Sequence, residues 1–165
     1  MKKIIIAIDS FKGCLTSAEA GKAAEKGIKS INPFCHTSVI PIADGGEGLL
    51  DVLITATKGK YITLSAHGPL MKMAKTHYGL SGNGRTAIIE MAAISGLPLV
   101  PIEQRNPMLT TTFGTGELIK DALNKGCRNF IIGIGGSATN DAGLGMLQAL
   151  GFRFLDKSGH TLRSE

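Results

Sequence analysis

The segment that most constrains the fold is residues 130–150, FIIGIGGSATNDAGLGMLQAL. Its apolar start, residues 130–132, predicts a strand, and the apolar spacing over residues 138–150 predicts a helix that Gly151 ends. Between them lie three glycines, whose lack of a Cβ lets a ligand approach the backbone: Gly133, Gly135 and Gly136. A strand, a glycine turn and a helix N-terminus direct backbone N–H groups at one point, which predicts a phosphate site.

The alternative is a simple strand-to-helix turn with Ser137 or Thr139 as the N-cap. Two features favour a ligand instead. Gly143 and Gly145 would each cost up to about 1 kcal/mol relative to alanine inside a helix, which indicates that something packs closely there. Asp141 falls in the first turn, where its carboxylate would repel a phosphate unless a cation or a transferable proton lay between them. An anion site that carries its own acid is typical of phosphoryl transfer.

Composition excludes several other classes of protein. The 165 residues are 43% hydrophobic, enough for a core, and the net charge of +5 comes from scattered Lys and Arg without interleaved aromatics, so nucleic-acid binding is not indicated. Three distant cysteines predict neither a disulfide framework nor a zinc site and favour a reducing compartment. Asp9 ends the apolar run 4–8 too early for a signal peptide, and no later run could span a membrane. We therefore expect a cytoplasmic protein that is not bound to a membrane.

The N-terminal third predicts two parallel strands separated by a helix. Residues 4–8 are apolar without alternation, as in fully buried parallel strands, and Thr16 and Glu19 have the spacing of a capping box that opens a helix. A second strand, residues 36–42, ends in the loop ADGGEG, which contains Asp44 and Glu47. These two acids also have capping-box spacing and could simply start the next helix. However, the carboxyl edge of a parallel sheet is where such folds bind ligands.

The central third predicts a change of architecture. A third strand over residues 61–66 is followed by two more, 73–80 and 85–91, and Asn83-Gly84 between these favours a type I′ hairpin. Because an antiparallel hairpin does not belong inside a run of βαβ units, we expect a boundary near residue 68. Residues 1–67 would then form the N-terminal part of a Rossmann-like parallel α/β lobe. Residues 68–165 would form part of a second, mixed α/β lobe that carries the glycine turn.

The remaining segments are less specific. Glu90 closes an apolar run and is either paired and structural or directed into a cleft. Residues 97–106 predict a loop or short turns, and residues 110–116 lead into a helix that Lys125 and Gly126 end. A short strand is expected over residues 152–155, followed by a polar turn that contains Asp156.

Two enzyme classes compete for the glycine turn. No Gly-Lys-Ser/Thr follows the glycines, so this is not a Walker loop, but Gly133, Gly135 and Ala138 fit the looser dinucleotide pattern, with Asp156 as a ribose contact. An NAD(P)-dependent oxidoreductase is therefore one alternative, and a noncatalytic interaction domain is another. Phosphoryl transfer needs Mg²⁺, a cation near the moving group and an oriented base. The residues that could supply this set are Asp9, Lys12, Asp44, Glu47 and Asp141.

Five segments in order along the chain are similar to signature segments of the type-1 glycerate kinase family: IAIDSFKGCLTSAEA, PIADGGEG, AIIEMAAISGL, TTFGTGELI and IGIGGSATNDAGLGMLQALG. The resemblance implies two α/β lobes around a cleft and ATP-dependent phosphorylation of D-glycerate with Mg²⁺, in bacterial members usually at the 2-hydroxyl, to give 2-phosphoglycerate rather than 3-phosphoglycerate. Cys14 departs from the small serine-type residue expected there. Family members are much longer, so we expect a C-terminal part beyond this chain, which could leave a fragment of this length inactive. Its oligomeric state, a homo-oligomer included, stays open.

Residue type and loop position give hypotheses for individual roles. Phosphate oxygens would be held by Gly133, Gly135, Gly136, Ser137 and Asn140. Substrate would contact Asp9, Ser10, Lys12, Arg85 and Arg105, with Lys12 also acting as a catalytic cation. Asp44 and Asp141 would divide the tasks of base and metal ligand, and Glu47 would be a further metal ligand.

Overall fold

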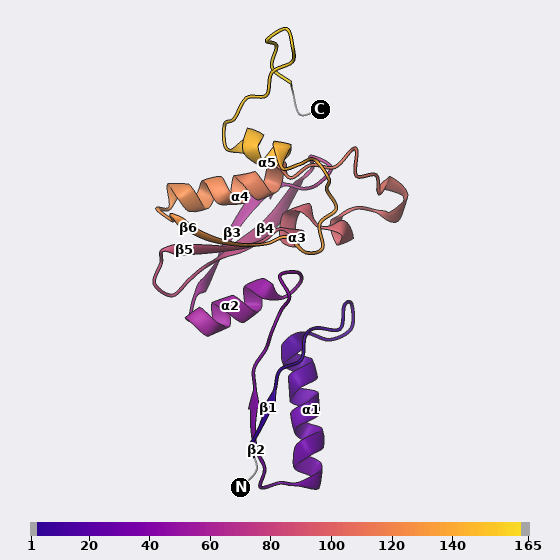
Figure 1. The fold of residues 1–165 in the computed structure, drawn as a ribbon, viewed down its shortest axis with the longest axis vertical. Helices are drawn as coiled ribbons and strands as arrows, with labels where there is room; N and C mark the ends of the chain where they lie inside the picture. Colours follow the sequence, from indigo (N-terminus) through magenta and orange to yellow (C-terminus); the bar gives the residue numbers. More distant parts are fainter. Residues whose placement is uncertain (1–2, 163–165) are drawn as a thin grey trace.

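A computed structural model, which describes residues 3–162, contains a small parallel sheet and a larger mixed sheet (Figure 1). The small sheet pairs β1 (Lys3–Ile6) with β2 (His36–Val39) in parallel, and α1 (Ser17–Ile31) connects them. The capping box is confirmed, because Glu19 N donates to Thr16 Oγ1 at 3.2 Å while Thr16 N donates to Glu19 Oε2 at 2.8 Å. α1 packs on the sheet through Gly21, whose missing Cβ leaves room for Val39.

The expectation that β1 is fully buried is wrong. Ile6 is buried, but Ile5 is 60% exposed. The reason is that α1 covers one face of the two-stranded sheet, whereas no second helix among residues 3–162 covers the other face (Figure 1). β1 and β2 are also shorter than the runs that predicted them.

The larger sheet has the strand order β3-β4-β5-β6. β3 (Lys60–His67), β4 (Met73–Leu80) and β5 (Thr86–Glu90) are antiparallel neighbours, and β6 (Asn129–Gly133) lies parallel to β5. The helices are α2 (Leu49–Thr57), α3 (Ala92–Ser95), α4 (Phe113–Asn124) and α5 (Leu144–Ala149), with short 3-10 turns η1 (Leu97–Leu99) and η2 (Ile102–Gln104). This mixed α/β architecture beside a parallel α/β unit is the predicted fold class.

Alternation along β5 gives the larger sheet two packed faces. Ala87 and Ile89 face a core that includes Leu118 of α4, and Ile88 faces Leu50 and Ile54 of α2. Ala87, Ile88 and Ile89 are all fully buried. α2 and α4 therefore hold β5 between them, which fixes the carboxyl end of β5 and of its parallel neighbour β6.

The sheets divide the chain earlier than the sequence indicated. β3, expected in the first lobe, pairs with β4 along its whole length, from Lys60 opposite Leu80 to His67 opposite Met73. α2 packs on the same sheet. The change of sheet therefore lies between β2 and α2, because β3 finds its hydrogen-bond partners on the strand that follows it.

Three local predictions also need correction. The β4–β5 hairpin is present, but its turn is not type I′. A type I′ turn needs a positive φ at both central residues, and here Gly84 has φ +69° whereas Asn83 does not have a positive φ. The helix after the glycine turn starts only at Leu144, because Ala142 and Gly143 adopt left-handed conformations that a helix cannot contain. The strand expected at residues 152–155 is a single bridge between Leu155 and Thr161 in a projecting hairpin (Figure 1).

Candidate functional site

The centre of the candidate site is a contact between two glycine loops, residues 44–48 and 133–136. Gly135 N donates to Gly45 O at 3.1 Å. A Cβ on Gly135 would lie 2.6 Å from the Gly46 Cα, and a Cβ on Gly133 would lie 2.6 Å from Gly45 O. Side chains cannot fit here, so the glycines allow two backbones to meet at the carboxyl end of the parallel strands.

This contact changes the role expected of the glycines. The Gly135 N–H is committed to Gly45, and Gly133 is buried against loop 44–48, so neither presents its backbone to a phosphate as predicted. Gly136 is exposed, has φ +74° and accepts from Leu97 N at 2.9 Å. Gly136 is therefore the glycine of this turn that remains suited to a ligand.

Loop 44–48 carries Asp44 to the same place. Gly46 N donates to Asp44 Oδ1 at 3.0 Å, and a Cβ on Gly46 would lie 3.2 Å from that oxygen and 3.7 Å from the Gly135 Cα. Asp44 and Glu47 do not form a capping box for α2, whose N-cap is Gly48 without a side-chain cap. Both carboxylates are exposed and therefore accessible to a ligand.

Glu90 at the end of β5 caps α2 instead. Leu50 N donates to Glu90 Oε2 at 3.2 Å. Burial raises the pKa of Glu90, the backbone N–H groups of Leu50 and Gly48 oppose the increase, and the nearby negative charges of Asp51 and Glu47 add to it. Of the two roles considered from sequence, Glu90 has the paired and structural one.

Asp141 links the starts of α4 and α5. Its Oδ2 accepts from Thr112 N and Thr112 Oγ1, both at 2.8 Å, and from Gly145 N at 3.1 Å, while Oδ1 accepts from Gly143 N at 3.0 Å. Burial alone would raise the pKa of Asp141, but these hydrogen bonds outweigh it and hold the pKa below its usual value. With both oxygens committed and the pKa low, Asp141 is poorly suited to the predicted tasks of base and metal ligand.

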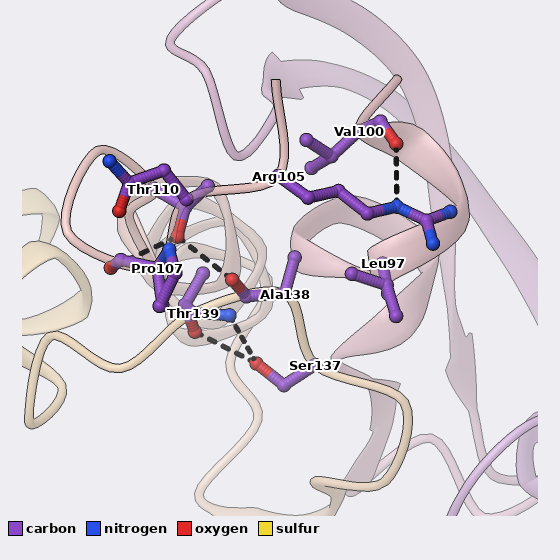
Figure 2. A pocket seen from close by; sticks show the side chains of 9 residues that line it. Leu97, Val100, Arg105, Pro107, Thr110, Ser137, Ala138 and Thr139 are labelled. Atoms are coloured by element: carbon purple, nitrogen blue, oxygen red, sulfur yellow. Dashed lines mark hydrogen bonds between the residues drawn. The ribbon is translucent and has the colours of Figure 1, made fainter. Parts of the chain in front are cut away.

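A pocket of about 260 Å³ adjoins the glycine turn (Figure 2). It is lined by Leu97, Val100, Arg105, Asn106, Pro107, Thr110, Ser137, Ala138 and Thr139. Arg105 Nε donates to Val100 O at 3.2 Å, and Ser137 Oγ lies 2.8 Å from Thr139 Oγ1. The structure thus brings together Arg105, predicted to bind substrate, and Ser137, predicted to bind phosphate.

Asn140 follows this pocket and is exposed. The residues Asp9, Ser10 and Lys12 lie on the loop after β1, at the end of the small sheet that faces the larger one (Figure 1). Ser10 N donates to Asp9 Oδ1 at 2.6 Å, and Lys12 is exposed. In the part of the chain that the structure describes, no hydrogen bond or ion pair connects these residues to the glycine loops. Their roles therefore stay predictions.

Arg85 lies elsewhere. It precedes β5, whose other end is Glu90, opposite Gly133 of β6. The length of the strand, about 3.3 Å per residue, separates Arg85 from the glycine turn. The structure therefore does not bring Arg85 to the glycine turn, and its contact with substrate stays a prediction.

The dinucleotide alternative also fails on geometry. Such a site needs the helix to begin at the glycines, but residues 137–143 separate Gly136 from α5. Asp156, the expected ribose contact, lies in the projecting hairpin, where its Oδ1 accepts from Ser158 N at 2.8 Å and His160 N at 2.9 Å. The pattern Gly133, Gly135 and Ala138 is therefore not a dinucleotide fingerprint.

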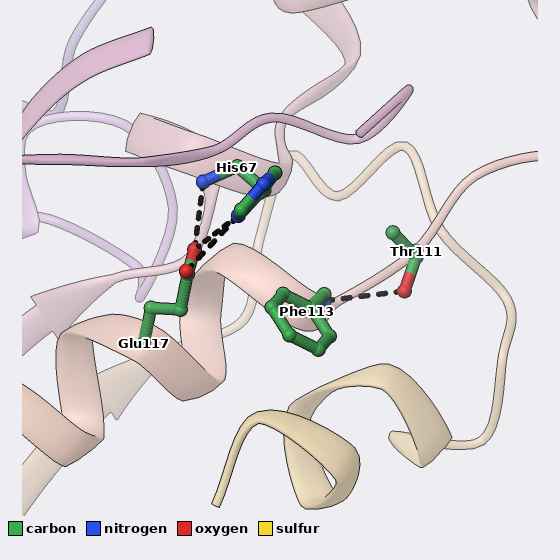
Figure 3. A network of polar contacts seen from close by, with 4 residues as sticks. All are labelled: His67, Thr111, Phe113 and Glu117. Atoms are coloured by element: carbon green, nitrogen blue, oxygen red, sulfur yellow. Dashed lines mark hydrogen bonds and ion pairs between the residues drawn. The ribbon is translucent and has the colours of Figure 1, made fainter. Parts of the chain in front are cut away.

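Sequence reasoning missed the residues that orient α4. Thr112 is the main partner of Asp141, and Glu117 accepts from His67 N at 2.7 Å while His67 Nδ1 lies 3.0 Å from its Oε1 (Figure 3). The Phe113 ring meets the His67 ring edge-on, with centroids 5.5 Å apart. These contacts join the end of β3 to the first turns of α4. The sequence signal for these contacts is the run of hydroxyls and glycines over residues 110–116, from which we predict only the start of a helix.

Only some of the carboxylates predicted to bind Mg²⁺ are accessible to the ion. Within residues 3–162, no three His, Cys, Asp or Glu side chains gather into a metal-binding group. Mg²⁺ usually takes one or two carboxylates together with phosphate oxygens and water. The exposed pair Asp44 and Glu47 fits that requirement, whereas Asp141 does not because its oxygens already accept four close hydrogen bonds.

No helix in residues 3–162 is long and apolar enough to cross a membrane.

Comparisons with known proteins identify relatives of this chain. The chain is 56% identical over 157 residues to a glycerate kinase of Bacillus subtilis and 51% identical over 160 residues to a glycerate 2-kinase of Escherichia coli. These alignments cover 95% and 97% of this chain, but 41% and 42% of the relatives. A crystal structure of a glycerate kinase homologue from Salmonella typhimurium LT2 superposes with a TM-score of 0.81 at 49% identity, covering 97% of this chain and 43% of that one.

The chain therefore spans less than half the length of these relatives. The family profile nevertheless matches almost all of it, residues 4–165. The match includes both glycine loops, the segment from Thr110 to Asp141 and the pocket beside the turn. This chain belongs to the glycerate kinase family.

Proposed function

We propose that this chain is part of an ATP-dependent glycerate kinase that phosphorylates the 2-hydroxyl of D-glycerate. The observation that carries the proposal is the contact of the two glycine loops, which sets an exposed acid, Asp44, beside a turn that adjoins a pocket with a cation, Arg105. A carboxylate base for the accepting hydroxyl, a glycine turn open to phosphate and a cation for an anionic substrate are among the groups that a kinase acting on an acid uses. The name of the Escherichia coli relative, glycerate 2-kinase, supports the choice of hydroxyl.

In the proposed reaction, the 2-hydroxyl oxygen of glycerate attacks the γ-phosphorus of ATP. A new P–O bond forms, the bond to the β,γ-bridging oxygen breaks, and ADP leaves with that electron pair. The hydroxyl proton passes to a carboxylate, for which we propose Asp44. Asp44 is exposed and accepts one hydrogen bond within its own loop, from Gly46, whereas the oxygens of Asp141 are occupied.

The phosphate contacts fall to the exposed part of the glycine segment. We assign them to the Gly136 backbone and the Asn140 side chain, both exposed and both on the segment that follows β6. Lys12 is proposed to add positive charge from the loop after β1. Glu47, with phosphate oxygens, would hold Mg²⁺, which neutralises charge on the phosphates when it is bound.

The experiment joins residues 1–165 to the remaining portion of the Bacillus subtilis relative. Phosphoryl transfer from ATP to D-glycerate is measured in two assays. The coupling enzyme of the first assay accepts 2-phosphoglycerate, and that of the second accepts 3-phosphoglycerate. We expect turnover in the first assay, and a loss of about 100-fold or more in Asp44→Asn, as is common when a general base is removed. Turnover in the second assay alone would reject the 2-hydroxyl. Absence of turnover in both, with a folded chimera, would reject the kinase.

Calorimetry on the 165-residue chain provides a direct comparison of nucleotides. Heat with MgATP and none with NAD is the expected outcome. Heat with NAD alone would support the oxidoreductase alternative and contradict the site described here.

A further inference from the structure

The pocket beside the glycine turn has properties that select among the ligands of the proposed reaction. Its volume is about 260 Å³, below the range of about 300–1,000 Å³ typical of pockets for larger organic ligands. A three-carbon acid fits within this volume, whereas a nucleoside triphosphate would extend beyond it. Among residues 3–162, Arg105 is the one charged residue in its lining, so the pocket complements a single negative charge better than a triphosphate.

Arg105 is held in place while most of its donors stay available. Its Nε donates to Val100 O at 3.2 Å, which orients the guanidinium beside Leu97 (Figure 2). Across residues 3–162, its terminal nitrogens have no hydrogen bond or ion pair with another residue. The guanidinium is exposed and therefore accessible, and its fork matches a carboxylate in a bidentate arrangement.

The hydroxyls of the pocket can be counted. Thr110 Oγ1 donates to Ala138 O at 2.8 Å, so its hydrogen is used. Ser137 Oγ and Thr139 Oγ1 lie 2.8 Å apart, and Thr139 N donates to Ser137 Oγ at 3.0 Å. One hydroxyl hydrogen joins the pair, which leaves the second hydrogen for a ligand oxygen.

The pocket and the glycine turn form one backbone unit. Leu97 N donates to Gly136 O and Ala138 N donates to Ser95 O, both at 2.9 Å. Ser137, which lines the pocket, therefore directly follows the glycine that we assign to phosphate. An acid anchored in the pocket would have its hydroxyl next to that glycine.

We propose that this pocket is the subsite for the carboxylate of the hydroxy-acid substrate, with Arg105 as its cation and the Ser137–Thr139 pair as its hydroxyl donor. Ser137 then serves the acceptor acid and not the nucleotide. The inference rests on the proposed kinase function, since the substrate is the one that the kinase phosphorylates. It predicts that Arg105 is what distinguishes glycerate from its neutral counterpart, glycerol.

The test uses Arg105→Gln and Arg105→Lys in the chimera with the Bacillus subtilis relative. The matched control is Arg128→Gln, an exposed arginine before β6 that also donates to backbone carbonyls, those of Leu123 and Cys127. A hydrogen-bonded charge pair corresponds to about 10- to 100-fold in affinity. Arg105→Gln should therefore raise KM for D-glycerate by about that factor, leave KM for ATP within about twofold and reduce the preference for D-glycerate over glycerol. Arg105→Lys should restore part of the preference, and Arg128→Gln should change none of these.

Other kinetic results would overturn the inference while leaving the kinase intact. These are an increase in KM for ATP in place of KM for D-glycerate, or unchanged constants in Arg105→Gln. If the chimera has no kinase activity, the proposed function fails, and calorimetry of the 165-residue chain with sodium D-glycerate and with inorganic phosphate decides the pocket separately. Binding of D-glycerate that Arg105→Gln abolishes and Arg128→Gln preserves supports the subsite. Binding of phosphate alone, or no Arg105-dependent binding, rejects it.

Discussion

Replacing Asp141 with Asn tests whether this acid is structural or catalytic. An Asn keeps one acceptor oxygen. If that oxygen takes the position of Oδ2, it still accepts hydrogen bonds from Thr112 and Gly145, but it carries no charge. The amide NH₂ then takes the position of Oδ1 and faces the Gly143 N–H, which loses its acceptor at 3.0 Å. Hydrogen bonds to charged groups contribute about 1.5–3 kcal/mol each. Because Asp141 is only half-buried, we expect a loss of about 2–4 kcal/mol in the free energy of unfolding, a decrease in Tm of about 5–15 °C.

The pH dependence of the free energy of unfolding gives a second measure of the contribution of Asp141 to stability. The folded pKa of Asp141 is lowered from 3.8, so its stabilisation is complete above that value and is lost as the pH falls through the folded pKa. The difference between Asp141→Asn and the parent should therefore be largest near pH 7 and vanish at low pH. Urea unfolding followed by circular dichroism measures both. The exposed Asp44, changed to Asn, is the matched control and should alter stability by less than about 0.5 kcal/mol.

One outcome would refute this reasoning. If Asp141→Asn unfolds like the parent but abolishes phosphoryl transfer in the chimera, while Asp44→Asn stays active, Asp141 is the catalytic acid and Asp44 is not. The crossed design distinguishes the two carboxylates because each variant is expected to change a different quantity.

Three further substitutions test the packing by chemical denaturation. Gly135→Ala puts a Cβ 2.6 Å from a backbone Cα and should lower the free energy of unfolding by about 1–3 kcal/mol. Gly27→Ala in α1, with nothing within 4 Å of its Cβ, should raise it by about 0.5–1 kcal/mol. Equal effects would contradict the glycine-loop contact. Tyr78→Phe removes a 2.9 Å hydrogen bond from a buried hydroxyl to an α4 carboxylate and should lower the free energy of unfolding by about 1–1.5 kcal/mol. The exposed Tyr61→Phe should lower it by less than about 0.5 kcal/mol. Similar losses would show that burial does not matter. Glu90→Gln should stabilise the chain progressively as the pH rises above 4.5, since the raised pKa of Glu90 means that its ionisation opposes folding; a pH-independent difference would reject that explanation.

Local signals made part of the fold predictable. The capping box at Thr16 and Glu19 joins residues three apart, and β4 was predicted with its observed bounds, Met73–Leu80, because the strand and its hairpin are contiguous. The helix ending at Lys125 and Gly126 was likewise found from its own spacing. Each of these elements is stabilised by hydrogen bonds within itself or to its neighbour in sequence.

The site was only partly predictable because its contacts are distant in sequence. Asp141 and its partner Thr112 are 29 residues apart, and a local pattern assigned each to its own helix. The spacing of apolar residues could not show that Ala142 and Gly143 are left-handed, and so it started α5 too early. It also suggested that the glycines bind phosphate, whereas Gly135 meets Gly45 of another loop.

The sequence alone determined the order and type of most elements, the two glycine loops and the family resemblance, since these depend on neighbouring residues and on motifs in series. Only the tertiary structure decided which groups remain available for chemistry. It occupies the oxygens of Asp141 and the N–H of Gly135 in long-range hydrogen bonds, and it brings Arg105 and Ser137 to one pocket. It places Arg85 in the β4–β5 hairpin, at the end of β5 opposite Glu90. The physical reason is that a polar group binds a ligand only if folding has not already supplied its partner, and those partners come from distant segments.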